Sequence, residues 1–399
     1  MGMFFLLILS GENVQAGQTS QTDRNAKQTQ VNEQAAEKVA DMEGLGMEEV
    51  LEEMDFSEIG DFLEEQDGIG DEVSFEGLVR AFLGQEEDVK YEYIGDYIKA
   101  IVLKSLNANK QLFLELLVVS LAYSILKNFS KSFSNSYISE ICFFVCYCFM
   151  MLLLLQSFYK LNETLQDTVG TMVDFMKLFI PTYCMAISFS LNLNSSAAIY
   201  SMIFMVIYLV EWLMRYFLVP LVQIYVLVEF LNHLMEEERF KRLAELIFDG
   251  VKVLLKAAIS LILGINIIQG MIAPAMDRLT GNTIAKTVQM LPGIGNVMSG
   301  TGQILLSSGI VIKNCVGAAA LVILIILCGI PFLNMAFIVL MYKVLAAILE
   351  PVADKRIAGG MNGVANGGFL CLKIMTSCMV LFFLTIALSS TATNWNVGG

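Results

Sequence analysis

Ionisable residues within the apolar part of this sequence are the residues that could do chemistry. Asp174 and Lys177 lie one helical turn apart, in the middle of a segment that leads to Pro181. Charged groups are costly inside a bilayer, so each one found there marks a functional site by default. We therefore predict that Asp174 and Lys177 face a wet interior.

Two more ionisable pairs lie near the ends of apolar segments, Glu211 with Arg215 and Glu229 with His233. A spacing of four residues places both members of a pair on one face of a helix. Such pairs suit a proton or ion path, and they equally suit interfacial groups that reach the lipid headgroups. Their position near segment ends favours the interfacial interpretation.

The sequence contains no recognisable catalytic or cofactor-binding motif. His233 is the single histidine, so a His-Glu-x-x-His zinc site cannot form, and no serine has a nucleophile-elbow context. The glycines at 293–302 are not followed by Lys-Ser or Lys-Thr, which a phosphate-binding loop requires. We expect no enzyme activity and no cofactor.

The eight cysteines all lie in or beside apolar runs. Cys142, Cys146 and Cys148 are close enough in sequence to suggest a metal site. Three thiols within one apolar helix are, however, more typical of small packing residues. We therefore expect no metal site, and no disulfide framework can be recognised.

The prolines indicate an internal duplication of the apolar part of the chain. Four of the six prolines pair at an offset of 111 residues, Pro181 with Pro292 and Pro220 with Pro331. The two repeats run from about 136 to 238 and from about 247 to 349. In many transporters, broken helices at corresponding positions of two repeats line the route of the substrate.

Segments 164–192 and 277–305 are equivalent under this offset, and each has the pattern of a polar amphipathic helix, a proline break and an arm of small residues. They cross the membrane as broken helices or enter it as re-entrant hairpins, where non-helical backbone needs protein or a watery cavity around it. The alternative is that Pro and Gly are simply common in membrane helices. The predicted path residues are Asp174, Lys177, Pro181, Pro292, Gly293, Gly295, Gly300 and Gly302.

The predicted fold class is all-α, a polytopic membrane helix bundle with a small helical extracytoplasmic head. Hydrophobic residues make up 56% of the 399 residues and charged residues 16%, against roughly a quarter charged in soluble proteins. Each apolar segment is close to the roughly 20 residues that one crossing needs. The expected spans are 111–127, 138–159, 197–214, 216–234, 253–273, 314–330, 331–349 and 369–389.

Basic residues leave two topologies open. If segments 164–192 and 277–305 cross, each repeat has four crossings and the repeats are parallel. The basic residues near 127–131, 239–256 and 355–356 then all face the cytoplasm, in agreement with the positive-inside rule. If the two segments are re-entrant, the repeats are inverted and the 239–242 loop lies outside. The charge bias favours the parallel arrangement.

The chain before the membrane domain (109–399) has three regions. Residues 1–16 have the apolar run and small-residue cleavage site of a signal peptide, although a basic n-region is missing. Residues 17–43 are polar, and we expect a disordered tether. Residues 44–108 are predicted to form a small acidic helical domain.

Residues 17–108 contain 23 acidic and 7 basic residues. This acidic balance gives no electrostatic reason to bind nucleic acid and disfavours an anionic lipid surface. One of the predicted short helices has Ser74 as a plausible N-cap and Gly84 as its end. So small a domain is marginal alone, and we expect it to dock on another surface.

An ordered set of segments resembles the stage III sporulation protein AE family, found in the membranes of endospore-forming Firmicutes. The resemblance covers most of the chain and includes the signal peptide, the small head and the polytopic domain. The missing basic n-region departs from it and puts the start site in doubt. The matching segments are Gln269-Gly-Met-Ile-Ala-Pro274, Ser308-Gly-Ile-Val-Ile-Lys-Asn314, Leu327-Cys-Gly-Ile-Pro331 and Leu349-Glu-Pro-Val-Ala-Asp354.

The resemblance implies a multi-pass protein of the mother-cell membrane that surrounds the forespore. It implies partners among the other proteins of the stage III A operon, including a secretion-type ATPase and ring-forming subunits, and indirectly the forespore stage II protein Q. These form a channel or secretion-like complex in which such a protein is the permease-like component. The family brings no catalytic residues.

Three functions remain open at this point. The repeats form a conduit that a partner ATPase drives, or the membrane domain is a scaffold that recruits the rings, or the chain is an independent ion-coupled transporter. The matched broken segments favour the conduit and the transporter over the scaffold. The weak head and the family context favour the conduit over the transporter.

Overall fold

The structure is a computed structural model in which all regular structure of the described residues is helical. The signal peptide and the tether predicted from the sequence lie outside the described residues, as does part of the span predicted at 111–127. The structure describes residues 48, 51, 54–66, 74–84, 110–111, 114–122, 125, 136–188, 193–235, 239–289, 295–351 and 355–392.

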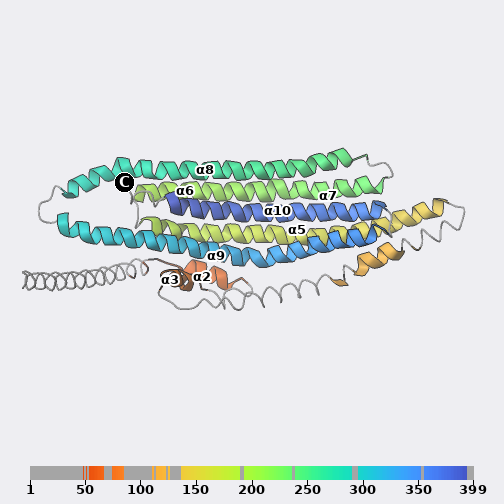
Figure 1. The fold of residues 1–399 in the computed structure, drawn as a ribbon, viewed down its shortest axis with the longest axis horizontal. Helices are drawn as coiled ribbons and strands as arrows, with labels where there is room; N and C mark the ends of the chain where they lie inside the picture. Colours follow the sequence, from red (N-terminus) through yellow and green to blue (C-terminus); the bar gives the residue numbers. More distant parts are fainter. Residues whose placement is uncertain are drawn as a thin grey trace, which may run out of the picture.

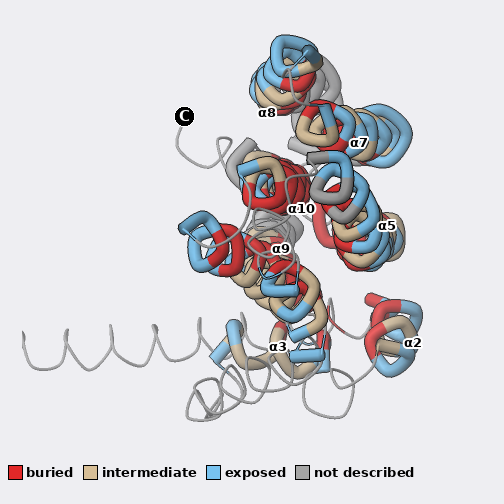
Figure 2. The backbone as a smooth tube through the Cα atoms, turned by 90° about the vertical axis from the view of Figure 1, so that its right-hand side faces the viewer, coloured by how far each residue is buried: buried red, intermediate tan, exposed pale blue. Residues whose placement is uncertain are grey.

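Long helical rods lie side by side and form an elongated bundle (Figure 1). Consecutive rods run in opposite directions, and α6 continues without interruption through the π-helix η1 into α7. In the end-on view, α10 lies in the middle of the bundle, with α8 and α7 on one side and α9 and α5 on the other (Figure 2). The rods are α5 (Ser136–Ser188), α6 (Leu193–Glu211), η1 (Trp212–Leu218), α7 (Val219–Leu234), α8 (Lys241–Gln289), α9 (Gly295–Leu349) and α10 (Lys355–Ala392).

Five helices among the described residues are long and apolar enough to cross a membrane, by length and composition. They contain 28 to 46 residues, which at 1.5 Å per residue corresponds to roughly 40–70 Å. The hydrocarbon core of a bilayer is about 30 Å thick. Each rod is therefore longer than one perpendicular crossing requires.

This architecture differs from the predicted spans. Segments predicted as separate crossings are joined within three continuous rods: 138–159 with 164–192 in α5, 197–214 with 216–234 in α6–η1–α7, and 314–330 with 331–349 in α9. The prediction of separate spans there was wrong because it took proline or polar residues as boundaries. A single proline removes one backbone hydrogen bond, and neighbouring helices can hold the apolar rod together across that position.

The predicted helix break at Pro181 is also wrong. Pro181 lies inside the 53-residue helix α5, which continues to Ser188, and its side chain is exposed on the outside of the bundle. Proline has no amide hydrogen to donate. Its ring here lies on the outer side of α5, where no neighbouring helix of the described structure has to pack. The chain then turns and returns as α6, so segment 164–192 is not a re-entrant hairpin.

Pro220 and Pro331 also lie within continuous rods. Pro331 is inside α9, and Pro220 is in the first turn of α7, directly after η1. Proline clashes with the carbonyl four residues earlier in an α-helix. A π-helix has a wider i→i+5 hydrogen-bond pattern, and η1 supplies this wider turn where Pro220 needs it.

The two predicted repeats each correspond to a pair of rods, α5 with α6–α7 and α8 with α9. The pairs have the same orientation along the chain, as in the parallel topology, but with two long rods where four crossings were predicted. Pro181 lies within α5, whereas its expected counterpart Pro292 lies between α8 and α9, outside the described residues. The duplication stays a prediction.

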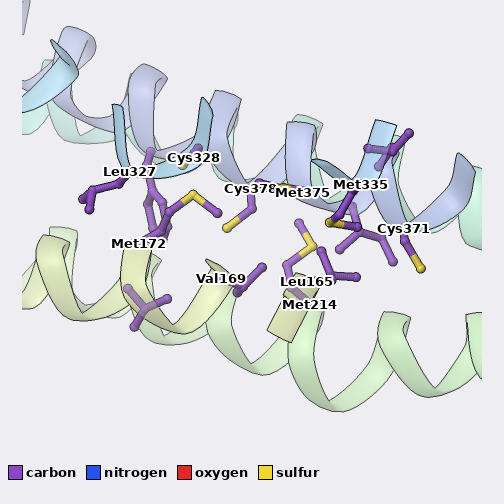
Figure 3. Packing of buried hydrophobic residues seen from close by; sticks show 14 of the residues in the cluster. Leu165, Val169, Met172, Met214, Leu327, Cys328, Met335, Cys371, Met375 and Cys378 are labelled. Carbon is purple, nitrogen blue, oxygen red and sulfur yellow. The ribbon is translucent and has the colours of Figure 1, made fainter. Parts of the chain in front are cut away.

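A buried apolar core rich in sulfur lies where α5, η1, α9 and α10 meet (Figure 3). Methionine and cysteine side chains fill irregular gaps between helices because methionine is unbranched and both are polarizable. Buried members of this core include Leu165, Val169, Met172, Met214, Cys328, Met335, Cys371, Met375 and Cys378.

The head contains helices α2 (Ser57–Glu64) and α3 (Phe75–Phe82). The predicted N-cap is confirmed, because the Ser74 hydroxyl accepts a hydrogen bond from the amide of Gly77. The predicted helix end is confirmed too, because Gly84 has a φ of 77°, which glycine adopts without steric cost.

The head docks on the helix bundle of its own chain. The rings of Phe62 and Phe175 lie 6.3 Å apart, and those of Phe75 and Phe179 lie 6.4 Å apart. The Thr182 hydroxyl donates a hydrogen bond to the backbone carbonyl of Asp55 at 3.4 Å. Aromatic pairs at these distances add to the burial of their apolar surface, so α5 provides a surface on which the small head packs.

Candidate functional site

The two ionisable pairs predicted on α5 and α6–η1 form one ionic network. The Lys177 ammonium lies 3.3 Å from a Glu211 carboxylate oxygen and 3.5 Å from an Asp174 oxygen. Glu211 also lies 4.0 Å from the Arg215 guanidinium, and Lys177 stands 5.5 Å above the centre of the Tyr208 ring. Lys177 therefore connects α5 to the following rod, which sequence spacing alone could not reveal.

This network lies on the outer surface of the bundle. The side chain of Asp174 is 62% exposed and that of Lys177 is 30% exposed, whereas the next residue towards the core, Val173, is fully buried. The structure thus places Asp174 and Lys177 away from the interior of their own chain. Since exposed ion pairs are worth little stability, folding alone does not account for these charges.

The pair Glu229 and His233 lies where α7 contacts α10. The imidazole Nδ1 is 3.4 Å from a Glu229 carboxylate oxygen and 2.9 Å from the Glu229 backbone carbonyl. A carbonyl oxygen only accepts hydrogen bonds, so this contact places a proton on Nδ1. The Tyr225 hydroxyl donates to the other Glu229 oxygen at 3.0 Å.

Glycines on α10 make room for this pair. A Cβ atom added to Gly359 would lie 2.2 Å from the His233 ring, and one added to Gly363 would lie 2.9 Å from the Glu229 Cβ. Backbone and side chains therefore approach closely here, as in other membrane helix contacts that use small residues. Among the predicted ionisable pairs, this one is held in a tight helix contact.

A lysine that the sequence analysis did not single out extends the polar contacts to α9. The Lys343 ammonium donates to the amide oxygens of Asn362 at 2.6 Å and Asn366 at 2.7 Å. Lys343 thus links α9 to α10 through two polar contacts.

Lys313 is a second lysine that the sequence analysis did not identify as a candidate. Its side chain is fully buried, and on the neighbouring residue Asn314 the amide oxygen accepts a hydrogen bond from the Ser390 hydroxyl of α10 at 2.7 Å. Buried lysines are rare. A lysine within the apolar helix Ser308–Leu349 could therefore have been recognised from the sequence as a candidate functional residue. The run Ile310-Val-Ile-Lys313 contains this lysine.

The remaining predicted path residues do not join these networks in the described part of the structure. Gly295, Gly300 and Gly302 lie in the first turns of α9, while Pro292 and Gly293 lie outside the described residues. Within the described ranges, no group of three or more His, Cys, Asp or Glu side chains could hold a metal ion. The described arrangement offers charge-bearing and hydrogen-bonding groups on α5, α7, α9 and α10.

Comparison with known proteins gives a consistent result across the chain. The sequence profile of the family described as Stage III sporulation protein AE matches residues 73–393. The curated protein named Stage III sporulation protein AE from Bacillus subtilis (strain 168) is 22% identical over 398 residues, covering 98% of this chain and 96% of that protein. No solved structure matches.

The profile begins in the head, just before α3, and ends at the end of α10. It therefore includes every rod of the bundle and both lysines that the sequence analysis missed. On this evidence, the chain belongs to the stage III sporulation protein AE family and has a role in sporulation.

Proposed function

We propose that this protein is the permease-like membrane component of a channel or secretion complex between the mother cell and the forespore. The family supplies the sporulation context, and five apolar helices supply the membrane character. In this proposal the protein is not an enzyme, and it lies in the mother-cell membrane that surrounds the forespore. Its partners are an ATPase, ring-forming proteins of the stage III A operon and, indirectly, stage II protein Q.

The observation that carries the proposal is the ionic network of Lys177, Glu211, Arg215 and Asp174 on two rods that are apolar enough to cross a membrane. Charges in such helices are expensive and mark the route of a polar substrate or ion by default. Exposed ion pairs contribute only about 0–1 kcal/mol to stability. A role in passage explains their presence better than a role in folding does.

Sporulation of the host that carries this chain provides the test. Asp174→Leu should abolish spore formation while the amount and location of the protein stay normal, because Lys177 would lose a counter-charge on a polar route. Asp249 on α8 pairs with Lys252 at 3.1 Å and is similarly exposed, so Asp249→Leu is the matched control and should sporulate normally.

The double variant Asp174→Leu with Lys177→Leu separates passage from simple charge pairing. If the two residues only neutralise each other against lipid, removing both should restore spore yield. Normal sporulation of the double variant would therefore refute a role of this network in passage.

A membrane scaffold for the ring-forming partners is the second candidate function. The packed interior favours it, because apolar and sulfur-containing side chains fill the space between α5, η1, α9 and α10 (Figure 3). A scaffold should tolerate loss of the ionic network and fail when partner contacts are lost. Recovery of the partners on Asp174→Leu protein, together with normal spore yield, would place the scaffold first.

A further inference from the structure

Helix α5 has two faces of opposite character along the same stretch. The inward face carries Leu165, Val169, Met172 and Met176, which are at most 2% exposed. The outward face carries charged residues spaced three, four or seven apart, so that they lie along one side of the helix. The charged face consists of Lys160, Glu163, Asp167, Asp174 and the partly exposed Lys177.

The outward face of α5 changes character at Tyr159. Before this residue it presents large apolar side chains such as Ile141, Phe144 and Leu152, each more than half exposed. These side chains suit contact with lipid. From Lys160 onward the same side of the same helix is charged, and charged groups facing hydrocarbon are costly. The charged face therefore needs water or protein against it.

Beside this face, the core of the described structure is packed mainly with apolar side chains. Leu165, Met172 and Met214 pack against α9 and α10 in a core that contains aliphatic and sulfur-containing side chains (Figure 3). A polar solute would have to displace these contacts to pass between the rods. The charged surface of α5 at this level lies on the outside of the bundle.

The charged face suits a second copy of the same chain. Lys160 is followed after one turn by Glu163, and Asp174 is followed after one turn by Lys177. A rotated copy with its α5 alongside would present an opposite charge within about one helical pitch of 5.4 Å. Among the described residues, Lys160, Glu163 and Asp167 form no ion pair within the chain, so all three are available to a neighbour.

We propose that the charged face of α5 is a contact between copies of this protein, and that the polar route lies between copies rather than through one chain. This inference rests on the proposed function and names where its route runs. The occupant of the charged face is a second copy, with water filling the space that the paired charges leave.

Cysteine crosslinking on the full chain in lipid nanodiscs tests this arrangement. Asp167→Cys places a thiol on the charged face, and Asp249→Cys places one at an exposed carboxylate position of α8 (Asp249 side chain 72% exposed). Unsubstituted protein controls for the native cysteines. Oxidation should shift most of the Asp167→Cys chain to dimer mass on a non-reducing gel, and leave Asp249→Cys and the unsubstituted protein monomeric.

Charge exchange provides a second measurement that does not depend on oxidation. Glu163→Lys alone should reduce the solution mass of the particle to that of a monomer, and Lys160→Glu combined with Glu163→Lys should restore the larger mass. Circular dichroism of each variant verifies that the helices remain intact. Equal crosslinking at both positions, crosslinking at neither, or a monomer mass for the unsubstituted protein would overturn the inference.

The failure of this inference can be distinguished from failure of the proposed function. A monomeric protein that still needs Asp174 for sporulation would remove the contact between copies and keep the role in passage. If the chain crosslinks through position 167 and the host sporulates normally without Asp174 and Lys177, the contact between copies is kept. The role of the ionic network in passage is then refuted.

Discussion

The contact between α7 and α10 differs sharply from the surface formed by α5 and α6, although both carry ionisable pairs at helical spacing. At the first, Glu229 and His233 press against the backbone of α10 at Gly359 and Gly363. At the second, Lys177 and Glu211 pair on the outside of the bundle. Sequence spacing made these pairs look alike, and only the neighbouring helix shows which one is fixed by packing.

The largest expected effect comes from filling the tight contact. A Cβ added to Gly367 of α10 would lie 2.3 Å from a methyl carbon of Val226 on α7, so Gly367→Val should force the helices apart. We expect a loss of about 1–3 kcal/mol or more in the free energy of unfolding, measured by thermal unfolding in detergent. The matched control is Gly264→Val, because nothing lies within 4 Å of a Cβ there.

Equal unfolding temperatures for these two glycine variants would mean that α7 and α10 do not approach as closely as described. The α7–α10 contact would then be no tighter than the open surface of α5 and α6. A lower unfolding temperature for Gly367→Val alone would support the tight α7–α10 contact.

An intermediate effect is expected from removing one carboxylate in each region. Glu229→Leu leaves the Tyr225 hydroxyl without its acceptor, which should cost about 1–3 kcal/mol of stability. Glu211→Leu removes only partly exposed ion pairs and should cost about 0–1 kcal/mol. Thermal unfolding of both variants under one condition measures the difference, and a reversed order would contradict the assignment of the two regions.

The smallest effect is expected in the head, where Ser57 and Asp55 lie on an exposed surface. The Ser57 side chain and backbone amide both donate to one Asp55 carboxylate oxygen, at 2.6 and 2.9 Å. These hydrogen bonds hold the pKa of Asp55 below its ordinary value. Ser57→Ala should therefore raise the pKa of Asp55, as followed by the carboxyl carbon chemical shift across a pH titration.

The sign of the accompanying stability change follows from the lowered pKa. Hydrogen bonds to the ionised Asp55 stabilise the folded head above the ordinary pKa of aspartate. This contribution is lost as the pH falls through the lowered value. An unchanged Asp55 titration in Ser57→Ala would show that the two hydrogen bonds do not hold the carboxylate.

Local features of the fold could be predicted from the sequence because they depend on residues close together in the chain. The Ser74 cap and the pairing of Glu229 with His233 join residues three and four apart in the chain. The Gly84 turn depends on one glycine. The all-helical class follows from the length and composition of the apolar runs. Each of these predictions is confirmed by the described structure.

Features that depend on the neighbouring helix could not be predicted. Lys343 meets Asn362 across the turn between α9 and α10, and Lys177 meets Glu211 across the turn between α5 and α6. The continuity of α5 through Pro181 was missed for a related reason. Whether a proline breaks a helix depends on whether other helices support the rod, and spacing within one segment contains no such information.

The π-helix η1 also determines the direction in which the rod presents its acidic residues. Glu211 and Glu229 are 18 residues apart, which equals about five full turns of an α-helix, so an uninterrupted helix would point both carboxylates the same way. Because η1 holds more residues per turn between them, the phase of α7 is rotated relative to α6. Glu211 consequently meets α5, whereas Glu229 meets α10. One rod thereby serves two separate polar environments, and a regular α-helix of unchanged length in place of η1 would turn α7 by about 100° and exchange the neighbours of Glu229.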